Sequence, residues 1–311
     1  MADAREHYPL VTIETADTLD GKSAASDRQN DVPIPARIGR YLILKRVGQG
    51  GMGVVYAAYD AALDRKIALK VVREGFKDSS QGRSRVMLEA QAMARLAHPN
   101  VVHVYEVGQD PVDGSGHLFI AMEFVPGLPL SEWVRRNRDT ASVGELVRLH
   151  LQAAAGLAAA HASGLIHRDF KPDNVLVGDD GRARVVDFGL ARALDRAQRV
   201  VPKPDAPLPS NSPGSRLTEV GAVLGTPGYM APEQVLGEEA DARSDQFSFC
   251  VALYEALYRQ LPFAGDTFEE FAINVLDGKL SRAPEQGLPL EIPILVEQAL
   301  RRGLSRDPSA R

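Results

Sequence analysis

Short runs of alternating or β-branched apolar residues dominate the first part of the chain that has a clear hydrophobic pattern. Runs of this kind occupy 41–47, 54–60 and 66–72, and a glycine cluster separates the first two. Two more follow at 101–108 and 117–125. Runs rich in Val, Ile and Tyr that are bounded by turn residues are typical of strands. The pattern therefore predicts an antiparallel sheet in this part of the chain.

Helical spacing replaces this alternation further along the chain. A helix is predicted over 84–97, because apolar residues there recur every three or four positions and form one inward face. The residues of that face are Val86, Ala90, Met93 and Ala97. The segment PGLPL (126–130) reads as a loop, and the chain from about residue 131 to its end reads mainly as helix.

Two segments in the helical half need separate interpretation. Residues 149–167 carry no formal charge, and about 20 apolar residues are enough to cross a bilayer. Alanine is the commonest residue of this segment and polar residues are interspersed, so a buried helix of a globular protein is the better interpretation. The proline-rich segment 195–216 reads as a flexible insertion. Strands first and helices afterwards predict an α+β fold.

Composition changes the picture mainly at the N-terminus. Residues 1–36 are polar, with seven acidic against three basic side chains, and they predict a disordered acidic leader. The remaining chain is nearly neutral, although the whole carries a net charge of −5. With no long Lys/Arg run, nucleic acid and anionic membranes are disfavoured as main partners. The single cysteine, Cys250, excludes an intrachain disulfide and suits a reducing, cytoplasmic compartment.

The glycine cluster VGQGGMGVVY (47–56) is the first candidate for chemistry. Its Gly48, Gly50 and Gly53 match G-x-G-x-x-G. A dinucleotide-binding fold requires a helix to begin inside this motif, but strand-forming residues follow here. A Walker P-loop requires Lys and Ser/Thr where two valines stand. A glycine-rich hairpin whose backbone N–H groups close over phosphates remains, alongside a plain hairpin turn.

Lys70 and Glu89 form a candidate ion pair. Lys70 lies in the strand-like run IALKVV, where an ordinary exposed lysine is the simplest interpretation. Glu89 falls on the apolar face of the predicted helix, where an unpaired carboxylate would be costly to bury. A buried acid requires a cation, and Lys70 on the neighbouring strand is the candidate. An ammonium group held in this way could also reach a phosphate.

Polar residues are densest in HRDFKPDN (167–174), directly before the apolar run VLV. This stretch contains Asp169 and Asn174, and Asp187 follows in VVDFG, at the end of the next apolar run. Carboxylate and amide oxygens are the ligands that Mg²⁺ prefers in proteins. These residues on adjacent hairpin strands predict a magnesium site. A salt-bridged surface hairpin could contain the same residue types, but this spacing disfavours it.

Together these motifs resemble the eukaryotic-type protein kinase catalytic domain, in its bacterial serine/threonine branch. The matching motifs are GQGGMGVV, IALK, HRDFKPDN, DFG and GTPGYMAPE, in the order typical of the family. The resemblance spans 41–311 and implies a bilobal α+β fold. The N-lobe, about 41–124, is a small antiparallel sheet with one helix, and the C-lobe, about 125–311, is larger and mainly helical. The family's final helix is expected to be truncated here.

The resemblance also implies structural roles for residues outside these motifs. Asp245 resembles the aspartate that braces the backbone of the catalytic loop, and Glu233 is implied to pair with Arg311. The implied regulatory stack consists of His167, Phe188 and Met93. Two mild departures from the family pattern are Phe170 and Cys250, and the activation segment is unusually long.

The implied catalytic residues surround the γ-phosphate. Asp169 would orient the substrate hydroxyl and accept its proton, and Lys171 would neutralise the transferred phosphate. Thr226 in GTPGY would bond to both side chains. Lysine at 171 together with Thr226 resembles kinases that act on serine and threonine. Arg168 resembles a receptor for a phosphate on the activation segment, for which Thr218 is the favoured acceptor.

The implied cofactors are ATP and Mg²⁺, with Mn²⁺ as an alternative ion. Lys70, held by Glu89, would contact the α- and β-phosphates, while Asn174 and Asp187 hold the metal. The other residues implied to contact the nucleotide are Val47, Gly48, Gly50, Gly51, Gly53, Val55, Ala68, Met122, Glu123, Val125 and Leu176.

The implied activity is transfer of the ATP γ-phosphate to protein Ser/Thr hydroxyls, with autophosphorylation on the activation segment, in bacterial signal transduction. A catalytically inactive, kinase-fold ATP sensor or scaffold is the alternative, and a kinase for small molecules is a third interpretation that the APE segment disfavours. Dimerisation through the kinase domain is a further arrangement that the resemblance allows. A membrane anchor beyond residue 311 is expected for a longer protein.

Overall fold

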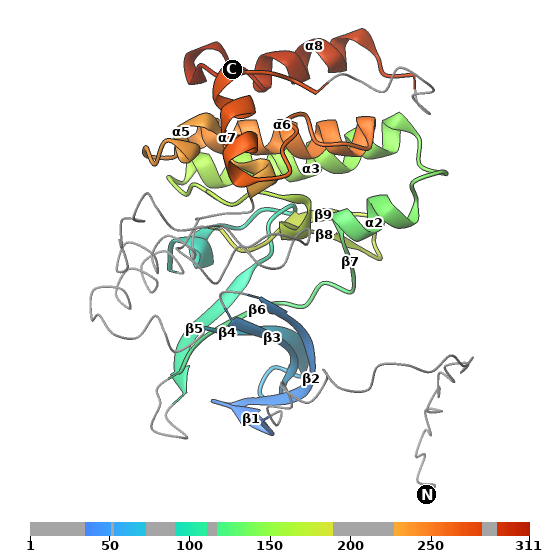
Figure 1. Cartoon of the computed structure of the whole chain (residues 1–311). Helices are drawn as coiled ribbons and strands as arrows, with labels where there is room; N and C mark the ends of the chain where they lie inside the picture. The colour runs from blue at the N-terminus through green and yellow to red at the C-terminus, as the bar shows by residue number, and fades with distance from the viewer. Residues whose placement is uncertain (1–34, 51–52, 73–90, 111–116, 189–226, 282–290) are drawn as a thin grey trace, which may run out of the picture. The chain divides into compact units, whose positions relative to one another are not determined.

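The six-stranded sheet of the N-lobe is antiparallel, and its strand order is β1-β2-β3-β4-β6-β5 (Figure 1). The structure is a computed structural model that describes residues 35–50, 53–72, 91–110, 117–188, 227–281 and 291–311. The strands are β1 Arg37–Ile38, β2 Tyr41–Gly50, β3 Gly53–Asp60, β4 Arg65–Val72, β5 Val104–Asp110 and β6 His117–Glu123. The strands and the antiparallel pairing predicted for this region are confirmed.

Side chains along β4 alternate between the two faces of the sheet. Ile67 and Leu69 are fully buried on one face of the sheet, where they pack with Tyr41 and Phe119. The intervening residues of the strand therefore point to the opposite face. Lys70 is one of these, and it is 5% exposed. The sheet thus carries its own small core on one side and presents a buried lysine on the other.

A second, three-stranded sheet lies where the two lobes meet (Figure 1). Its strands are β7 Gly127–Pro129, β8 Val175–Gly178 and β9 Ala183–Val185. The prediction that PGLPL is a loop was wrong, because Gly127–Pro129 pairs with β8 in antiparallel register. Gly127 has φ of +155°, and a Cβ there would overlap the carbonyl oxygen of Val177. Glycine is therefore required at this position, and Pro129 is tolerated because β7 is an edge strand.

The helical lobe is a stack of α-helices with short 3₁₀ turns (Figure 1). Its helices are α2 Leu130–Arg136, α3 Val143–Ala162, α5 Pro232–Val235, α6 Ala242–Tyr258, α7 Phe268–Asp277 and α8 Ile294–Gly303. The 3₁₀ turns are η2 Pro172–Asn174, η3 Pro227–Tyr229 and η4 Pro308–Ala310. The helix predicted over 84–97 falls mainly outside the described residues, but 91–95 are helical.

Helix α3 contains most of the uncharged segment identified in the sequence. It begins with a capping box, in which the Ser142 hydroxyl accepts from the N–H of Glu145 and the Glu145 carboxylate accepts from the N–H of Ser142. The helix packs against α6 and β9. Within the described part of the chain, no helix is both long and apolar enough to cross a membrane. Ala153 and Ala160 of this helix are fully buried.

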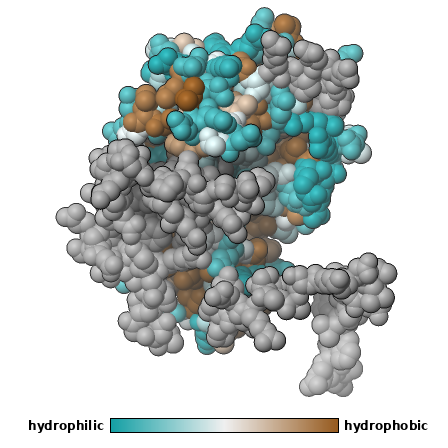
Figure 2. All heavy atoms as spheres, viewed as in Figure 1, coloured by the Kyte–Doolittle hydropathy of each residue, from teal (hydrophilic) through white to brown (hydrophobic). Residues whose placement is uncertain are grey.

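Helix α6 is the central support of the helical lobe. Its N-cap, Asp241, accepts from the N–H groups of Arg243 and Ser244. Most of its residues are buried, including Asp245 and Cys250. On the face shown in Figure 2, teal hydrophilic residues cover much of this lobe and brown residues form small groups between them. Many buried apolar residues of the lobe belong to α6 or pack against it.

Candidate active site

The loop that connects α3 to β8 is held in place by hydrogen bonds to Asp245 of α6. The Asp245 carboxylate accepts the N–H of His167 and the N–H of Arg168, both at 2.7 Å, and lies 2.7 Å from Nε2 of His161. Asp245 is 1% exposed. Arg168 adopts φ of +68°, a conformation that costs energy for a residue with a Cβ. The predicted bracing role of Asp245 is confirmed, and it stabilises this strained turn.

The braced loop positions three polar side chains. The Lys171 ammonium lies 3.1 Å from Oδ2 of Asp169. The Asn174 amide nitrogen donates to the backbone carbonyl of Asp169 at 2.7 Å. Its amide oxygen is therefore the end of the side chain suited to ligating a metal. The arrangement places a carboxylate beside a cation, with an amide held on the same turn.

Asp187 meets Lys70 across the two lobes. The Lys70 ammonium lies 2.8 Å from Oδ1 of Asp187, which follows β9 and has φ of +63°. Burial acts to raise the pKa of Asp187, but the charge of Lys70 and its hydrogen bond outweigh burial, and the pKa is lowered. His167 and Lys171 act in the same direction. Asp187 is therefore ionised at neutral pH, as a metal ligand must be.

Aromatic rings pack against one another next to Asp187 and the catalytic loop. The rings of His167 and Phe188 lie with centroids 4.9 Å apart, and Phe188 is 1% exposed. Nε2 of His167 lies 2.9 Å from the carbonyl oxygen of Val186. Met93 belongs to the same buried cluster as Phe188. The His167–Phe188 contact of the predicted stack is therefore present, and Met93 lies in the same buried cluster, while its contact with Phe188 stays a prediction.

The glycine-rich turn joins β2 to β3, as the strand-loop-strand interpretation predicts. Gly48 and Gly50 lie on β2, and a Cβ added at either would meet no atom of the described residues within 4 Å. Gly53, by contrast, has φ of +151°, and a Cβ there would overlap the carbonyl oxygen of Val71. Glycine is thus required at Gly53 for the pairing of β3 with β4, and Val47 beside the turn is exposed.

The residues expected to enclose adenine come from both lobes. Val55 pairs with Lys70 across β3 and β4, and Ala68 pairs with Met122 across β4 and β6. Leu176 pairs with Pro129 across β7 and β8. Val55, Ala68 and Leu176 are all partly buried. Backbone register thus carries Val55 and Ala68 to the sheet face that Lys70 occupies, while Leu176 lies on the other sheet. The contact of these residues with adenine stays a prediction.

The segment 123–125, which joins the two lobes, has an ion-pair network that sequence reasoning missed. Nε of Arg184 lies 3.3 Å from Oε1 of Glu123, and the Arg184 guanidinium makes two hydrogen bonds to Asp180 at 2.7 and 3.1 Å. The N–H of Glu123 donates to the carbonyl of His103 at 2.8 Å. Val125 follows within the same segment. Arg184 thus ties this connection to the β8–β9 hairpin.

The predicted pair of Glu233 and Arg311 is confirmed. The Arg311 guanidinium donates to both carboxylate oxygens of Glu233, at 2.7 and 2.9 Å, and the Ser244 hydroxyl donates to Oε1 at 2.6 Å. Nε2 of Gln234, which no sequence signal singled out, donates to the carbonyl of Arg168 at 2.7 Å. Glu233, the last residue of GTPGYMAPE, therefore contacts α6, and Gln234 contacts the catalytic loop.

Four residues of the predicted site lie outside the described residues: Gly51, Glu89, Thr218 and Thr226. The pairing of Lys70 with Glu89 therefore stays a prediction. So do the contacts of Thr226 with Asp169 and Lys171, and the role of Thr218.

The metal prediction is consistent with the side chains of Asn174 and Asp187. Among the described residues, no group of three or more His, Cys, Asp or Glu side chains is arranged to hold a metal ion. Mg²⁺ keeps several waters and is commonly bound through one or two carboxylates plus substrate phosphates. One amide oxygen and one ionised carboxylate therefore suit Mg²⁺ that arrives with a phosphate ligand.

Comparison with known proteins shows similarity to protein kinases. The model of the family described as "Protein kinase domain" matches residues 41–311. The chain is 37% identical over 265 residues to serine/threonine-protein kinase PknL of Mycobacterium tuberculosis, covering 85% of this chain and 61% of PknL. It is 34% identical over 274 residues to PknA of the same species, covering 88% of this chain and 58% of PknA. It is 30% identical over 295 residues to PknD of Protochlamydia amoebophila, covering 88% and 29%.

Proposed function

Because the chain belongs to the protein kinase domain family, we propose that it transfers the γ-phosphate of ATP to serine and threonine hydroxyls of proteins. The observation that carries this proposal is the assembly of Asp169, Lys171 and Asn174 on one loop braced by Asp245, facing the Lys70 and Asp187 pair. Positioning and charge neutralisation are the main requirements of phosphoryl transfer.

Each polar side chain has a definite task in this mechanism. Asp169 orients the substrate hydroxyl and accepts its proton, and Lys171, 3.1 Å away, neutralises charge on the transferred phosphate. Lys70 would contact the α- and β-phosphates. Asn174 and Asp187 would hold Mg²⁺, or Mn²⁺ in its place, and the ion would supply charge neutralisation to the phosphates.

The proposal extends to regulation. Arg168 stands next to Asp169, and a bidentate guanidinium–phosphate contact would order an activation segment phosphorylated at Thr218. Autophosphorylation is the proposed source of that phosphate. Thr226 is proposed to act as an unmodified hydroxyl that bonds to Asp169 and Lys171.

The chain spans about three fifths of the length of the first curated relatives it matches, 61% of PknL and 58% of PknA. The whole protein's activity, substrates and partners are therefore part of the proposal. We propose bacterial signal transduction as its role and the cytoplasm as the location of this domain, with dimerisation through the domain as a further feature. An inactive ATP sensor or scaffold is less well supported, because Lys70, Asp169, Asn174 and Asp187 are all present.

Substitution of Asp169 tests the proposal. Asp169→Asn is expected to lower phosphotransfer to a basic protein substrate by about 10²–10⁴-fold, because removal of a general base costs about that much. ATP affinity, measured by calorimetry, should change little. Asp179→Asn, at an exposed position of the β8–β9 turn, is the matched control and should transfer phosphate normally.

Retention of near-wild-type transfer by Asp169→Asn would show that the catalytic assignment is wrong. Tight ATP binding by the wild type without turnover of any protein substrate would favour the sensor alternative. Faster turnover of small-molecule hydroxyls than of proteins would favour the third interpretation.

A further inference from the structure

The peptide that joins Arg168 to Asp169 is held at both of its polar groups. Nε2 of Gln234 donates to its carbonyl oxygen at 2.7 Å, and its N–H donates to Nδ1 of His167 at 3.4 Å. A peptide unit is planar, so fixing these two groups fixes the direction of the N–Cα bond of Asp169. The Asp169 carboxylate is carried on that bond, so its direction depends on Gln234 and His167.

The backbone at this peptide needs support, because Arg168 adopts φ of +68°. A strained conformation of this kind persists only where the surrounding contacts hold it. The Asp245 carboxylate accepts the N–H of Arg168 at 2.7 Å, and Gln234 donates to the carbonyl of the same residue. Arg168 is thus held at one end by α6 and at the other end by α5.

The side-chain amide of Gln234 has a defined orientation. Its Oε1 accepts the N–H of Ala231 at 3.0 Å. An amide nitrogen donates and a carbonyl oxygen accepts, so exchanging the two ends of the amide would break both hydrogen bonds. Gln234 lies on α5, directly after Glu233, whose carboxylate is paired with Arg311. The donor that reaches the catalytic loop is therefore carried by an anchored element.

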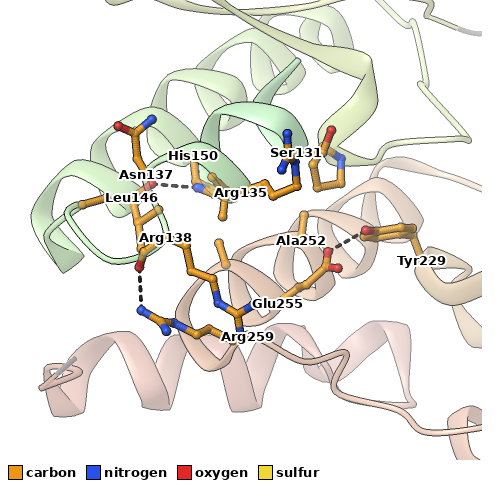
Figure 3. A pocket seen from close by; sticks show the side chains of 14 residues that line it. Ser131, Arg135, Asn137, Arg138, Leu146, His150, Tyr229, Ala252, Glu255 and Arg259 are labelled. Atoms are coloured by element: carbon orange, nitrogen blue, oxygen red, sulfur yellow. Dashed lines mark hydrogen bonds between the residues drawn. The ribbon is translucent and has the colours of Figure 1, made fainter. Parts of the chain in front are cut away.

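The described part of the GTPGYMAPE motif is anchored to α6. Tyr229 lies in the wall of a cavity of about 210 Å³ beside α6, and its hydroxyl donates to Glu255 at 2.5 Å (Figure 3). The carbonyl oxygen of Tyr229 accepts the Ser248 hydroxyl at 2.7 Å. Helix α6 also supplies Asp245, which holds the catalytic loop. Gln234, the residue after the motif, adds a direct hydrogen bond to that loop.

We propose that Gln234 is a positioning residue for Asp169. Its hydrogen bond holds the Arg168–Asp169 peptide so that the Asp169 carboxylate meets the substrate hydroxyl, and it ties this orientation to the position of the GTPGYMAPE motif on α6. The inference rests on the proposed phosphotransfer, in which Asp169 accepts the proton. The side-chain hydrogen bonds of Gln234 go to Ala231 and Arg168, neither of which is assigned to ATP or metal. Its replacement should therefore slow transfer and leave nucleotide binding unchanged.

Replacement by methionine, which has a similar length and cannot donate, tests this role. Gln234→Met should lower kcat for a basic protein substrate by about 10–100-fold, because a misplacement of about 1 Å can cost that much, while KM for ATP stays the same. Gln234→Lys, whose ammonium can donate to the same carbonyl, should retain more activity. Gln152→Met is the matched control, because it removes a 2.7 Å hydrogen bond from the N–H of Ala183, and it should keep the kcat of the wild type.

A double variant shows whether Gln234 acts through Asp169. In an Asp169→Asn background, single-turnover assays should show that Gln234→Met lowers the residual rate little further, because the group that it positions is gone. Losses that multiply would overturn the proposal. So would a similar loss of kcat in Gln152→Met, equal activity of Gln234→Lys and Gln234→Met, or a loss confined to KM for ATP.

The wild type separates this inference from the proposed function. Absence of phosphate transfer by the wild type to any protein would overturn both. Transfer by the wild type that Gln234→Met matches would overturn the inference alone. Circular dichroism checks that each variant is folded. If Gln234→Met does not fold, Gln234→Glu replaces it in the same assays, since it keeps the size of the side chain and places a carboxylate against the Arg168 carbonyl.

Discussion

The contact between Lys70 and Asp187 shows how the pKa of a single side chain depends on its environment. Lys70 is nearly fully buried, and Asp187 is 29% exposed at its side chain. Because the pKa of Asp187 is lowered in the folded chain, ionised Asp187 stabilises the fold above its ordinary pKa. That contribution is lost as the pH falls through the lowered value. Lys70 therefore contributes to stability as well as to the proposed chemistry.

Replacing Lys70 tests this contribution. Lys70→Met should lower the free energy of unfolding at pH 7 by about 1–3 kcal/mol, less than for a fully buried pair because Asp187 is partly exposed and still faces Lys171. Denaturant unfolding should be measured from about pH 7 down to about pH 3. The difference in unfolding free energy between Lys70→Met and the wild type should shrink at acid pH, because Asp187 protonates. Lys45→Met on the exposed part of β2 is the control. An equal loss at all pH values would contradict the ion pair.

At the scale of elements, Gly156 shows how α3 fits against the segment that enters the site. A Cβ at Gly156 would overlap the carbonyl oxygen of Asn100. That oxygen accepts the N–H of Val185 at 2.8 Å, and the Asn100 side chain donates to the carbonyl of Ala183 at 2.8 Å. Glycine in mid-helix therefore permits the contact of α3 with the strand that precedes Asp187.

The helix offers an internal comparison for this argument. Gly156→Ala should lower the free energy of unfolding by about 1–3 kcal/mol, because the added methyl group is forced against backbone. Gly144→Ala, in the first turn of α3, should raise it by about 0.5–1 kcal/mol, since its Cβ would meet only the Ser142 hydroxyl at 3.9 Å. Denaturant unfolding measures both. Stabilisation by both substitutions would show that Gly156 is not sterically required.

At the scale of the whole molecule, Glu233 and Arg311 hold distant parts of the chain together. The Arg311 side chain is 0% exposed and that of Glu233 is 8% exposed. Burial acts to raise the pKa of Glu233, but the hydrogen bonds from Arg311 and Ser244 outweigh it, and the pKa is lowered. The pair therefore connects α5, at the end of the GTPGYMAPE motif, to the start of α6 and to η4.

Removing one partner of this pair should be strongly destabilising. Arg311→Met should lower the free energy of unfolding at pH 7 by about 3–5 kcal/mol, because Glu233 is left buried and unpaired. Since the pKa of Glu233 is lowered, the stabilisation is complete above its ordinary value and declines as the pH falls through the lowered one. Arg301→Met, which breaks an exposed pair with Glu297, should cost about 0.5 kcal/mol or less. Similar losses in both variants would contradict this account.

Much of the architecture was predictable because it depends on near neighbours. Alternation placed strands at 41–47, 54–60 and 66–72, and uncharged alanine-rich spacing indicated the helix that became α3. The ordered motifs indicated that Asp169, Asn174 and the other site residues belong together. The exception was Gly127–Pro129, since its strand pairing requires β8, whose place is not encoded locally. Patterns with periods of two or 3.6 residues report on such local structure directly.

Only the tertiary structure decided the contacts between residues far apart in the sequence. It gave Lys70 a partner in Asp187 and joined Arg184 to Glu123. The sequence by itself determined the family, most of the element types and the chemistry available at each position. Which charged groups pair with one another cannot be read from local patterns, because pairing depends on distance and burial. The packing of all the elements sets both of these at once.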